Sequence, residues 1–142
     1  MKKSLNILTK ISLVMVAFSC VSCTATNAKK GYKAIKQDMR SRIVNYGYSS
    51  ESIRFLYCDY VSFEDPKLAR SYPIYNDVIT YSVYTQANFT GSLTRYRDIY
   101  IYYRSDGSLK YLDSDDSYDT FALAISLVES GEVKGKVGTI KD

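Results

Sequence analysis

The feature that most constrains the fold is a set of alternating runs separated by very short turns between residues 78 and 112. The run VITYSVYTQANF is followed by a TGS turn, the run TRYRDIYIYYR, an SDG turn and the run SLKYL. Such alternation is typical of half-buried strands, and SDG is a hairpin signal. Short connections join adjacent antiparallel strands. With the earlier run SIRFLYCDYVSF, the sequence predicts a four-stranded antiparallel meander.

A helix is predicted on either side of this meander along the chain. Upstream, apolar residues recur at three- and four-residue steps, and Gly47 suits the position just past the helix end; these residues are Tyr32, Ile35, Met39, Ile43 and Tyr46. Downstream, a helix is expected to begin near Tyr118, capped by Asp116 or Ser117, and residues 121–128 are apolar nearly all round. Helices on one face of an antiparallel sheet make an α+β domain. We expect one α+β domain over residues 32–131, its C-terminal helix packed on the sheet, and a tail or short edge strand over 132–142.

The first alternating run is apolar on much of both faces. One face is expected to hold Ile53, Phe55, Tyr57, Val61 and Phe63, and the other Arg54, Leu56, Cys58 and Tyr60. Cys58 is interpreted as a small buried hydrophobe, because free cysteine is often buried. The alternative is a disulfide between Cys23 and Cys58 in an oxidising compartment.

The chain begins with a positive head and a short apolar stretch. Lys2 and Lys3 precede the apolar run 11–18, and the small residues of SCVSC follow. A positive head, about 7–15 apolar residues and then small residues are typical of a secretory signal peptide. The run is shorter than the roughly 20 apolar residues that a membrane-spanning helix needs. The sequence therefore predicts export.

The two cysteines at the end of this stretch refine the prediction. The sequence AFSCVSC resembles the lipobox of bacterial lipoproteins, in which a small residue precedes an acylated cysteine, although the leucine that this family favours three positions upstream is absent. The resemblance implies a signal peptide over 1–19, lipid attachment at Cys20 (alternatively Cys23), a tether over 20–31, and a cell-envelope location with the membrane as a partner. The alternative is ordinary cleavage near Thr24, which would give a soluble secreted or periplasmic protein.

The order of a helix followed by a meander resembles cystatin-like folds, including those of small envelope lipoproteins. The segment QANFTGS and the later DIYIYYRSDGSLKYL resemble parts of uncharacterised members of that group. The resemblance supports the α+β fold and implies no catalytic residue.

Composition excludes several kinds of chemistry. The chain has no histidine, which removes Ser-His-Asp and Cys-His catalysis and histidine metal sites. The acidic run DSDDSYD has Tyr118 and Ala124 where a calcium-binding EF-hand needs glycine and glutamate. Without Lys2, Lys3 and Lys10 of the signal peptide, 16 Lys+Arg face 15 Asp+Glu, a net charge of +1. We therefore expect no metal, no cofactor and no nucleic-acid partner.

Tyrosine is the residue in excess, with 15 copies. Tyr96, Tyr100 and Tyr102 alternate on one predicted strand, and Tyr84 is expected on the same face of its neighbour. Rings with polar tips suit protein or glycan surfaces. The long predicted loop 64–77 adds contact residues of the same kind, namely Arg70, Tyr72 and Tyr75. The sequence thus predicts a binding module, rather than an enzyme, that recognises an envelope protein or glycan.

Two other functions stay open on the sequence alone. One is a carboxylate-dependent envelope hydrolase, for which the candidates are Asp59, Glu64, Asp65 and Asp98. The other is a purely structural spacer. In addition, the basic face of the first helix could attract anionic lipid next to an anchor; its residues are Lys29, Lys30, Lys33, Lys36 and Arg40.

Overall fold

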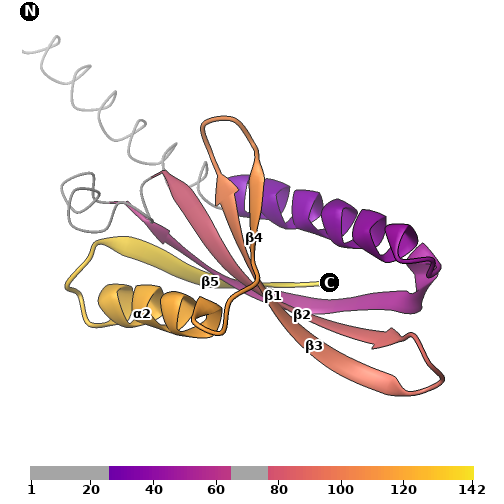
Figure 1. The fold of residues 1–142 in the computed structure, drawn as a ribbon. Coiled ribbons are helices and arrows are strands. Elements are labelled where there is room, and N and C mark those ends of the chain that lie inside the picture. The colour runs from indigo at the N-terminus through magenta and orange to yellow at the C-terminus, as the bar shows by residue number, and fades with distance from the viewer. Residues whose placement is uncertain (1–25, 65–76) are drawn as a thin grey trace, which may run out of the picture.

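A computed structural model describes residues 26–64 and 77–142 of the chain. A helix covers residues 26–45, and a short 3-10 turn, η1 (Ser50–Ser52), leads into the sheet. The other elements are β1 (Ile53–Phe63), β2 (Val78–Asn88), β3 (Leu93–Tyr103), β4 (Leu109–Leu112), α2 (Ser117–Glu129) and β5 (Gly135–Lys141). All neighbouring strands are antiparallel, in the order β4-β3-β2-β1-β5 (Figure 1). The predicted α+β class and the meander β1 to β4 are confirmed.

The fifth strand corrects the expectation of four. Residues 135–141, which the sequence analysis placed in a tail or short edge strand, pair along β1 from Phe63 to Tyr57. Two glycines permit this close pairing, because a Cβ at Gly138 would overlap the ring of Tyr60 and a Cβ at Gly135 would overlap the carbonyl of Ser62. Glycine and lysine are poor strand signals, but lysine is common on edge strands.

A β-bulge in β1 overturns the predicted division of its faces. Phe55 pairs with Thr85 and Tyr57 pairs with Tyr84, so Leu56 is the extra residue. An extra residue shifts every later side chain to the opposite face. Ile53 and Phe55 therefore lie on the same face as Cys58 and Tyr60, and Tyr57 lies on the other face.

The two helices cover opposite faces of the sheet, and not one face as expected (Figure 1). The 26–45 helix packs with Cys58, Tyr60, Tyr81, Tyr100 and their neighbours in one core cluster. On the other face α2 packs with a second cluster that includes Val61, Phe63, Ile99 and Ile101. The alternation of isoleucine and tyrosine in β3 explains this arrangement, since successive side chains of a strand point to opposite faces.

The first helix starts earlier than the sequence suggested. Residues 26–31, which had been assigned to the tether, are helical. Ala28 is fully buried, and its carbonyl accepts a 2.7 Å hydrogen bond from the Tyr81 hydroxyl. Ala28 lies one helical turn before Tyr32 and extends the same apolar stripe. Because alanine is small and its neighbours are polar, the sequence of this helical turn resembles that of a linker.

Several predicted residues lie outside the described part of the chain. They are Cys20 and Cys23, Asp65, and the loop residues Arg70, Tyr72 and Tyr75. Cys58 is described, and it is fully buried, in agreement with its interpretation as a small buried hydrophobe. Burial raises the pKa of this thiol to about 12, so it is a neutral core group. The disulfide with Cys23 remains a prediction.

Candidate functional site

A groove lies between the C-terminal half of the 26–45 helix and the sheet. We call it the helix–sheet groove. Its volume is about 340 Å³, within the range of small-ligand pockets. Its apolar residues are Met39, Ile43, Tyr46, Tyr48, Ile53, Ala87, Phe89 and Tyr96, and its polar residues are Arg42, Thr85, Asp98, Tyr100, Tyr111 and Asp113.

The end of the helix shapes the rim of this groove. Gly47 has a φ of +86°, its N–H donates to the Val44 carbonyl, and the N–H of Tyr48 donates to the Ile43 carbonyl. These two bonds make a Schellman motif, as the position of Gly47 predicted. The motif turns the chain back so that the Tyr48 ring lies 4.7 Å from the Phe89 ring, centroid to centroid. Tyr96 lies 6.0 Å further on, which completes a row of three aromatic rings.

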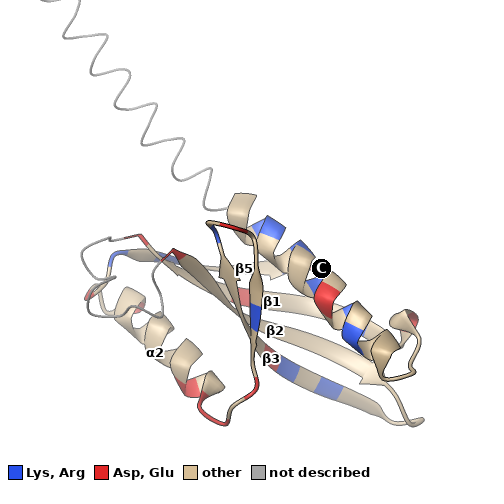
Figure 2. Cartoon of the chain, turned by 45° about the horizontal axis from the view of Figure 1, so that its top comes forward, with Lys and Arg blue, Asp and Glu red and all other residues tan. Residues whose placement is uncertain are grey.

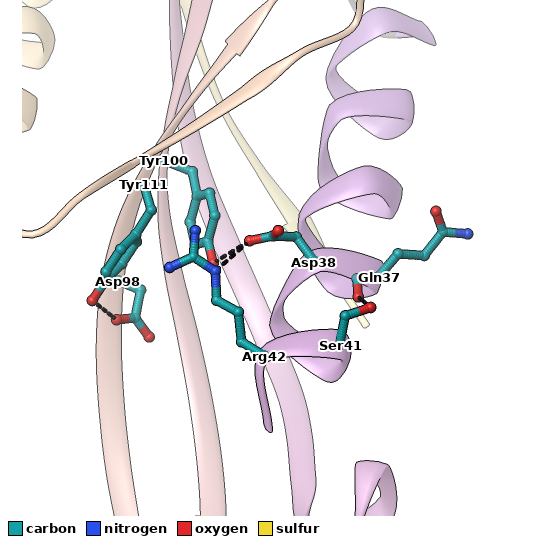
Figure 3. Close-up of polar contacts among 7 residues, drawn as sticks. All are labelled: Gln37, Asp38, Ser41, Arg42, Asp98, Tyr100 and Tyr111. Atoms are coloured by element: carbon teal, nitrogen blue, oxygen red, sulfur yellow. Dashed lines mark hydrogen bonds and ion pairs between the residues drawn. The ribbon is translucent and has the colours of Figure 1, made fainter. Parts of the chain in front are cut away.

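The polar side of the groove holds two sets of hydrogen bonds, one between the helix and β3 and one between β4 and β3, which a cation–π contact of Arg42 connects (Figure 3). Asp38 Oδ2 accepts from Arg42 Nε at 2.9 Å and from the Tyr100 hydroxyl at 3.1 Å. The Arg42 guanidinium lies 4.7 Å from the Tyr111 ring, and the Tyr111 hydroxyl donates to Asp98 Oδ1 at 3.0 Å. The side chains that form this network are thus fixed before any ligand arrives.

Burial shifts the acidity of two groups in this network. It raises the pKa of Asp98 above its usual value, although the hydrogen bond from Tyr111 and the charge of Arg42 act in the opposite direction. Burial and the neighbouring Asp98 carboxylate raise the pKa of Tyr111 to about 12, so Tyr111 stays a hydrogen-bond donor at neutral pH. Asp98 is therefore a carboxylate that lacks much of its hydration shell and would gain from a cationic partner.

Thr85 supplies an unpaired polar group to the groove. Its side chain lines the groove and is 1% exposed, and its Oγ1 has no hydrogen-bond partner. Buried hydroxyls are nearly always hydrogen-bonded, because leaving one unpaired costs about 1–3 kcal/mol. The charged groups of this region are Asp38, Asp98 and Asp113 against Arg42, which gives three negative charges and one positive charge.

The predicted tyrosine face does not exist as one surface. Tyr100 and Tyr102 are buried beneath the 26–45 helix, 1% and 8% exposed. Tyr84 pairs with Arg97, so it lies on the opposite face from Tyr96, which pairs with Thr85. The bulge-free pairing of β2 with β3 fixes this result, because paired residues share a face. Tyr96 alone of the four is an exposed residue of the groove rim.

The candidate carboxylates also separate. Asp59 accepts a hydrogen bond from Thr139 on the α2 side of the sheet, and Glu64 follows the end of β1. Asp98 lies in the groove together with Asp113, a pair that the sequence analysis did not identify. The sequence patterns also do not indicate Arg42, Tyr48 and Thr85 as residues of the groove. Only the Tyr46-Gly-Tyr48 sequence at a predicted helix end could have indicated the rim.

The basic face of the first helix is partly occupied by intramolecular contacts. Lys36 Nζ forms a 2.9 Å ion pair with Asp142 at the end of β5. The Arg40 guanidinium lies 4.9 Å from the Phe55 ring. Attraction to anionic lipid therefore remains a prediction, with Lys29, Lys30 and Lys33 as its other basic groups.

None of the family models, curated proteins or solved structures that were compared with the chain matches it. Within residues 26–64 and 77–142, no helix combines the length and the apolar character that crossing a membrane requires. No group of three His, Cys, Asp or Glu residues in the same part of the chain could hold a metal ion.

Proposed function

We propose that this protein is an exported, lipid-anchored binding module of a bacterial cell envelope, and that its ligand occupies the helix–sheet groove. The observation that carries the proposal is an aromatic rim next to two polar groups, the buried and unpaired Thr85 hydroxyl and the desolvated Asp98 carboxylate. An apolar body with a polar end, rather than a flat glycan surface, fits this arrangement.

The polar end of the ligand is proposed to be an ammonium group. The groups Asp38, Asp98, Asp113 and Arg42 sum to a charge of −2 when all are ionised. A cation would offset the desolvation of Asp98, and the rings of Tyr48, Phe89 and Tyr96 would attract it further. The Thr85 hydroxyl can accept a hydrogen bond from the same N–H groups.

Titration of the protein with 2-phenylethylammonium, monitored by NMR, tests whether the groove binds a cation. The uncharged 2-phenylethanol, which has nearly the same shape, serves as the control ligand. Saturable shifts are expected at Thr85, Asp98 and Tyr111, with binding about tenfold or more weaker for the alcohol. Affinity for the cation should fall as the pH drops through the raised pKa of Asp98, because the protonated carboxyl carries no charge, while the alkylammonium stays charged below about pH 9.

A matched pair of variants completes this test. Asp98→Asn should lose about tenfold or more in affinity for the ammonium, whereas Asp59→Asn, on the opposite face, should bind like the wild type. Equal affinities for the ammonium and the alcohol would refute the charge argument. The absence of saturable binding to either would refute the groove as the site.

The anchor has its own test, the intact mass and N-terminal peptide of the mature protein isolated from membranes. We expect a diacyl- or triacyl-modified peptide that begins at Cys20, or at Cys23 if that cysteine is processed. Replacement of the modified cysteine by alanine should move the protein to the soluble fraction. An unmodified peptide that begins near Thr26 would show ordinary secretion instead.

A carboxylate-dependent hydrolase is the second candidate, because Asp98 has a raised pKa and shares the groove with Asp113. A general acid with a raised pKa near a second carboxylate is the arrangement that glycosidases use. New reducing ends after incubation with envelope glycans, absent with Asp98→Asn, would favour hydrolysis. Binding without product would favour the module.

A further inference from the structure

The face of the sheet opposite the groove carries a second surface near the β2–β3 hairpin. On this face α2 packs over residues such as Val61, Phe63, Ile99 and Ile101, and it leaves the hairpin half of the strands uncovered (Figure 2). We call the uncovered surface the tyrosine platform. Its residues are Arg54, Tyr57, Tyr84, Gln86, Arg95, Arg97 and Lys141.

The register of the strands arranges these residues in two rows. The first row runs across four strands as Lys141, Tyr57, Tyr84 and Arg97. The second runs across three strands as Arg54, Gln86 and Arg95. Neighbouring strands lie about 4.8 Å apart, so the first row spans about 14 Å. This is an elongated surface with a cation at both ends of each row.

The centre of the platform is held in place by ring contacts. The Tyr57 and Tyr84 rings stack with centroids 4.4 Å apart and planes 20° from parallel. The Arg97 guanidinium lies 5.7 Å from the Tyr84 ring, and its Nε donates to Ser82 Oγ at 2.7 Å. Burial raises the pKa of Tyr57, so its hydroxyl remains a donor. The platform is therefore rigid and rich in hydrogen-bond donors.

The platform carries a net positive charge. Its four cations are Arg54, Arg95, Arg97 and Lys141; the carboxylates near them are Asp59 on the same face and Asp113 and Asp115, which share a hollow with Arg97, so the balance is +1. Arg54 and Arg95 have no carboxylate opposite them in the strand register. Among the described residues, the salt bridges are formed by other basic residues, namely Lys36, Arg42 and Arg104. Basic residues along β3 are visible in Figure 2 on the part of the strand away from α2. A surface of this kind complements an extended anion.

The position of the platform indicates what kind of anion it meets. The start of the 26–45 helix packs at Tyr81, and the helix, about 30 Å long, ends beside the hairpin half of the sheet. The hairpin end of the platform, with Arg54, Gln86 and Arg95, thus lies far from the start of the helix, whereas Lys141 lies near Lys29 and Lys33. We propose that it binds an acidic polysaccharide of the envelope. The choice of a glycan over a lipid surface rests on the N-terminal anchor of the proposed function, which would direct the hairpin end of the platform away from the membrane.

The binding of polygalacturonate oligomers by the mature full-length protein tests this proposal, with dextran oligomers of equal length as the neutral match. The double variant Arg54→Gln/Arg95→Gln should lose about tenfold or more in affinity for polygalacturonate, and dextran should not bind. The matched control Lys110→Gln/Lys134→Gln removes two exposed charges away from the platform and should change the affinity less than about twofold. Tyr84→Leu should weaken binding although it leaves every charge in place.

Three results would overturn the proposal. Equal losses in the two double variants would show a response to net charge alone. Tenfold tighter binding to single-stranded oligonucleotides, or to vesicles of anionic phosphatidylglycerol, would assign the platform to a different partner. Because the platform variants leave the groove intact, their affinity for 2-phenylethylammonium should equal that of the wild type, so that failure of this proposal and failure of the groove can be told apart.

Discussion

Replacement of Tyr100 by alanine should destabilise the protein by about 3–5 kcal/mol, the usual cost of removing a large buried aromatic side chain. Tyr100 is 1% exposed beneath the 26–45 helix. Its ring lies 5.2 Å from that of Tyr111, and its hydroxyl donates to Asp38. Alanine would leave a cavity between helix and sheet and remove a hydrogen bond of the groove network. Urea denaturation followed by circular dichroism measures the loss.

Two further variants show whether burial is the cause. Tyr100→Phe keeps the ring and should cost about 1 kcal/mol, the worth of the lost hydrogen bond. Tyr96→Ala removes a tyrosine from the same strand and the same face, but that side chain is 42% exposed, so its cost should stay below about 1 kcal/mol. Equal losses for Tyr96→Ala and Tyr100→Ala would contradict the packing described here.

The substitution Gly31→Val is expected to destabilise the fold by about 2–4 kcal/mol. A Cβ there would overlap the Tyr81 hydroxyl and lie 2.8 Å from Tyr81 Cζ and 3.0 Å from Tyr102 Cγ. Tyr81 cannot move aside easily, because its ring is fully buried and its hydroxyl is bonded to the Ala28 carbonyl. Overpacking typically costs about 1–3 kcal/mol and the strained hydrogen bond about 1 more. The helix would have to lift from the sheet.

The sign of the stability change in Gly31→Val is informative, because helix propensity alone would make this replacement of glycine stabilising. Glycine inside a helix costs up to about 1 kcal/mol relative to alanine, so most exposed helical glycines gain stability when replaced. Lys33→Val, in the same helix at an exposed position, serves as the control and should cost less than about 1 kcal/mol. A gain in stability for Gly31→Val in urea denaturation would mean that the helix does not approach the sheet so closely.

The meander could be predicted from the sequence because short turns and period-two alternation depend only on residues that are close together along the chain. The TGS and SDG turns leave few alternatives for β2, β3 and β4. The bulge at Leu56 was not predictable, since an extra residue in one strand is defined only by its pairing with another. The same holds for β5, whose glycines become favourable only when Tyr60 and Ser62 lie beneath them.

The sequence predicted the types of residue that form the candidate site but not where in the fold the site lies. Aromatic residues with polar tips do form the groove rim. Of the four predicted tyrosines, Tyr96 lies at this rim, Tyr100 lines the buried polar side of the groove, and Tyr84 belongs to the other face. The groove depends on the distance between a helix and strands far along the chain, for which a single sequence has no local signal. Thr85 illustrates this, because a threonine in a strand is ordinary until its hydroxyl is found buried and unpaired.

The alternation of Arg95, Tyr96, Arg97 and Asp98 in β3 makes one strand serve both surfaces. Its even-numbered residues line the acidic groove, and its odd-numbered residues belong to the basic platform. A slip of β3 by one residue would exchange the two sets, since side-chain direction has a period of two. The sheet therefore acts as a partition between regions of opposite electrostatic potential, and an insertion or deletion within residues 93–98 would damage both recognition surfaces at once.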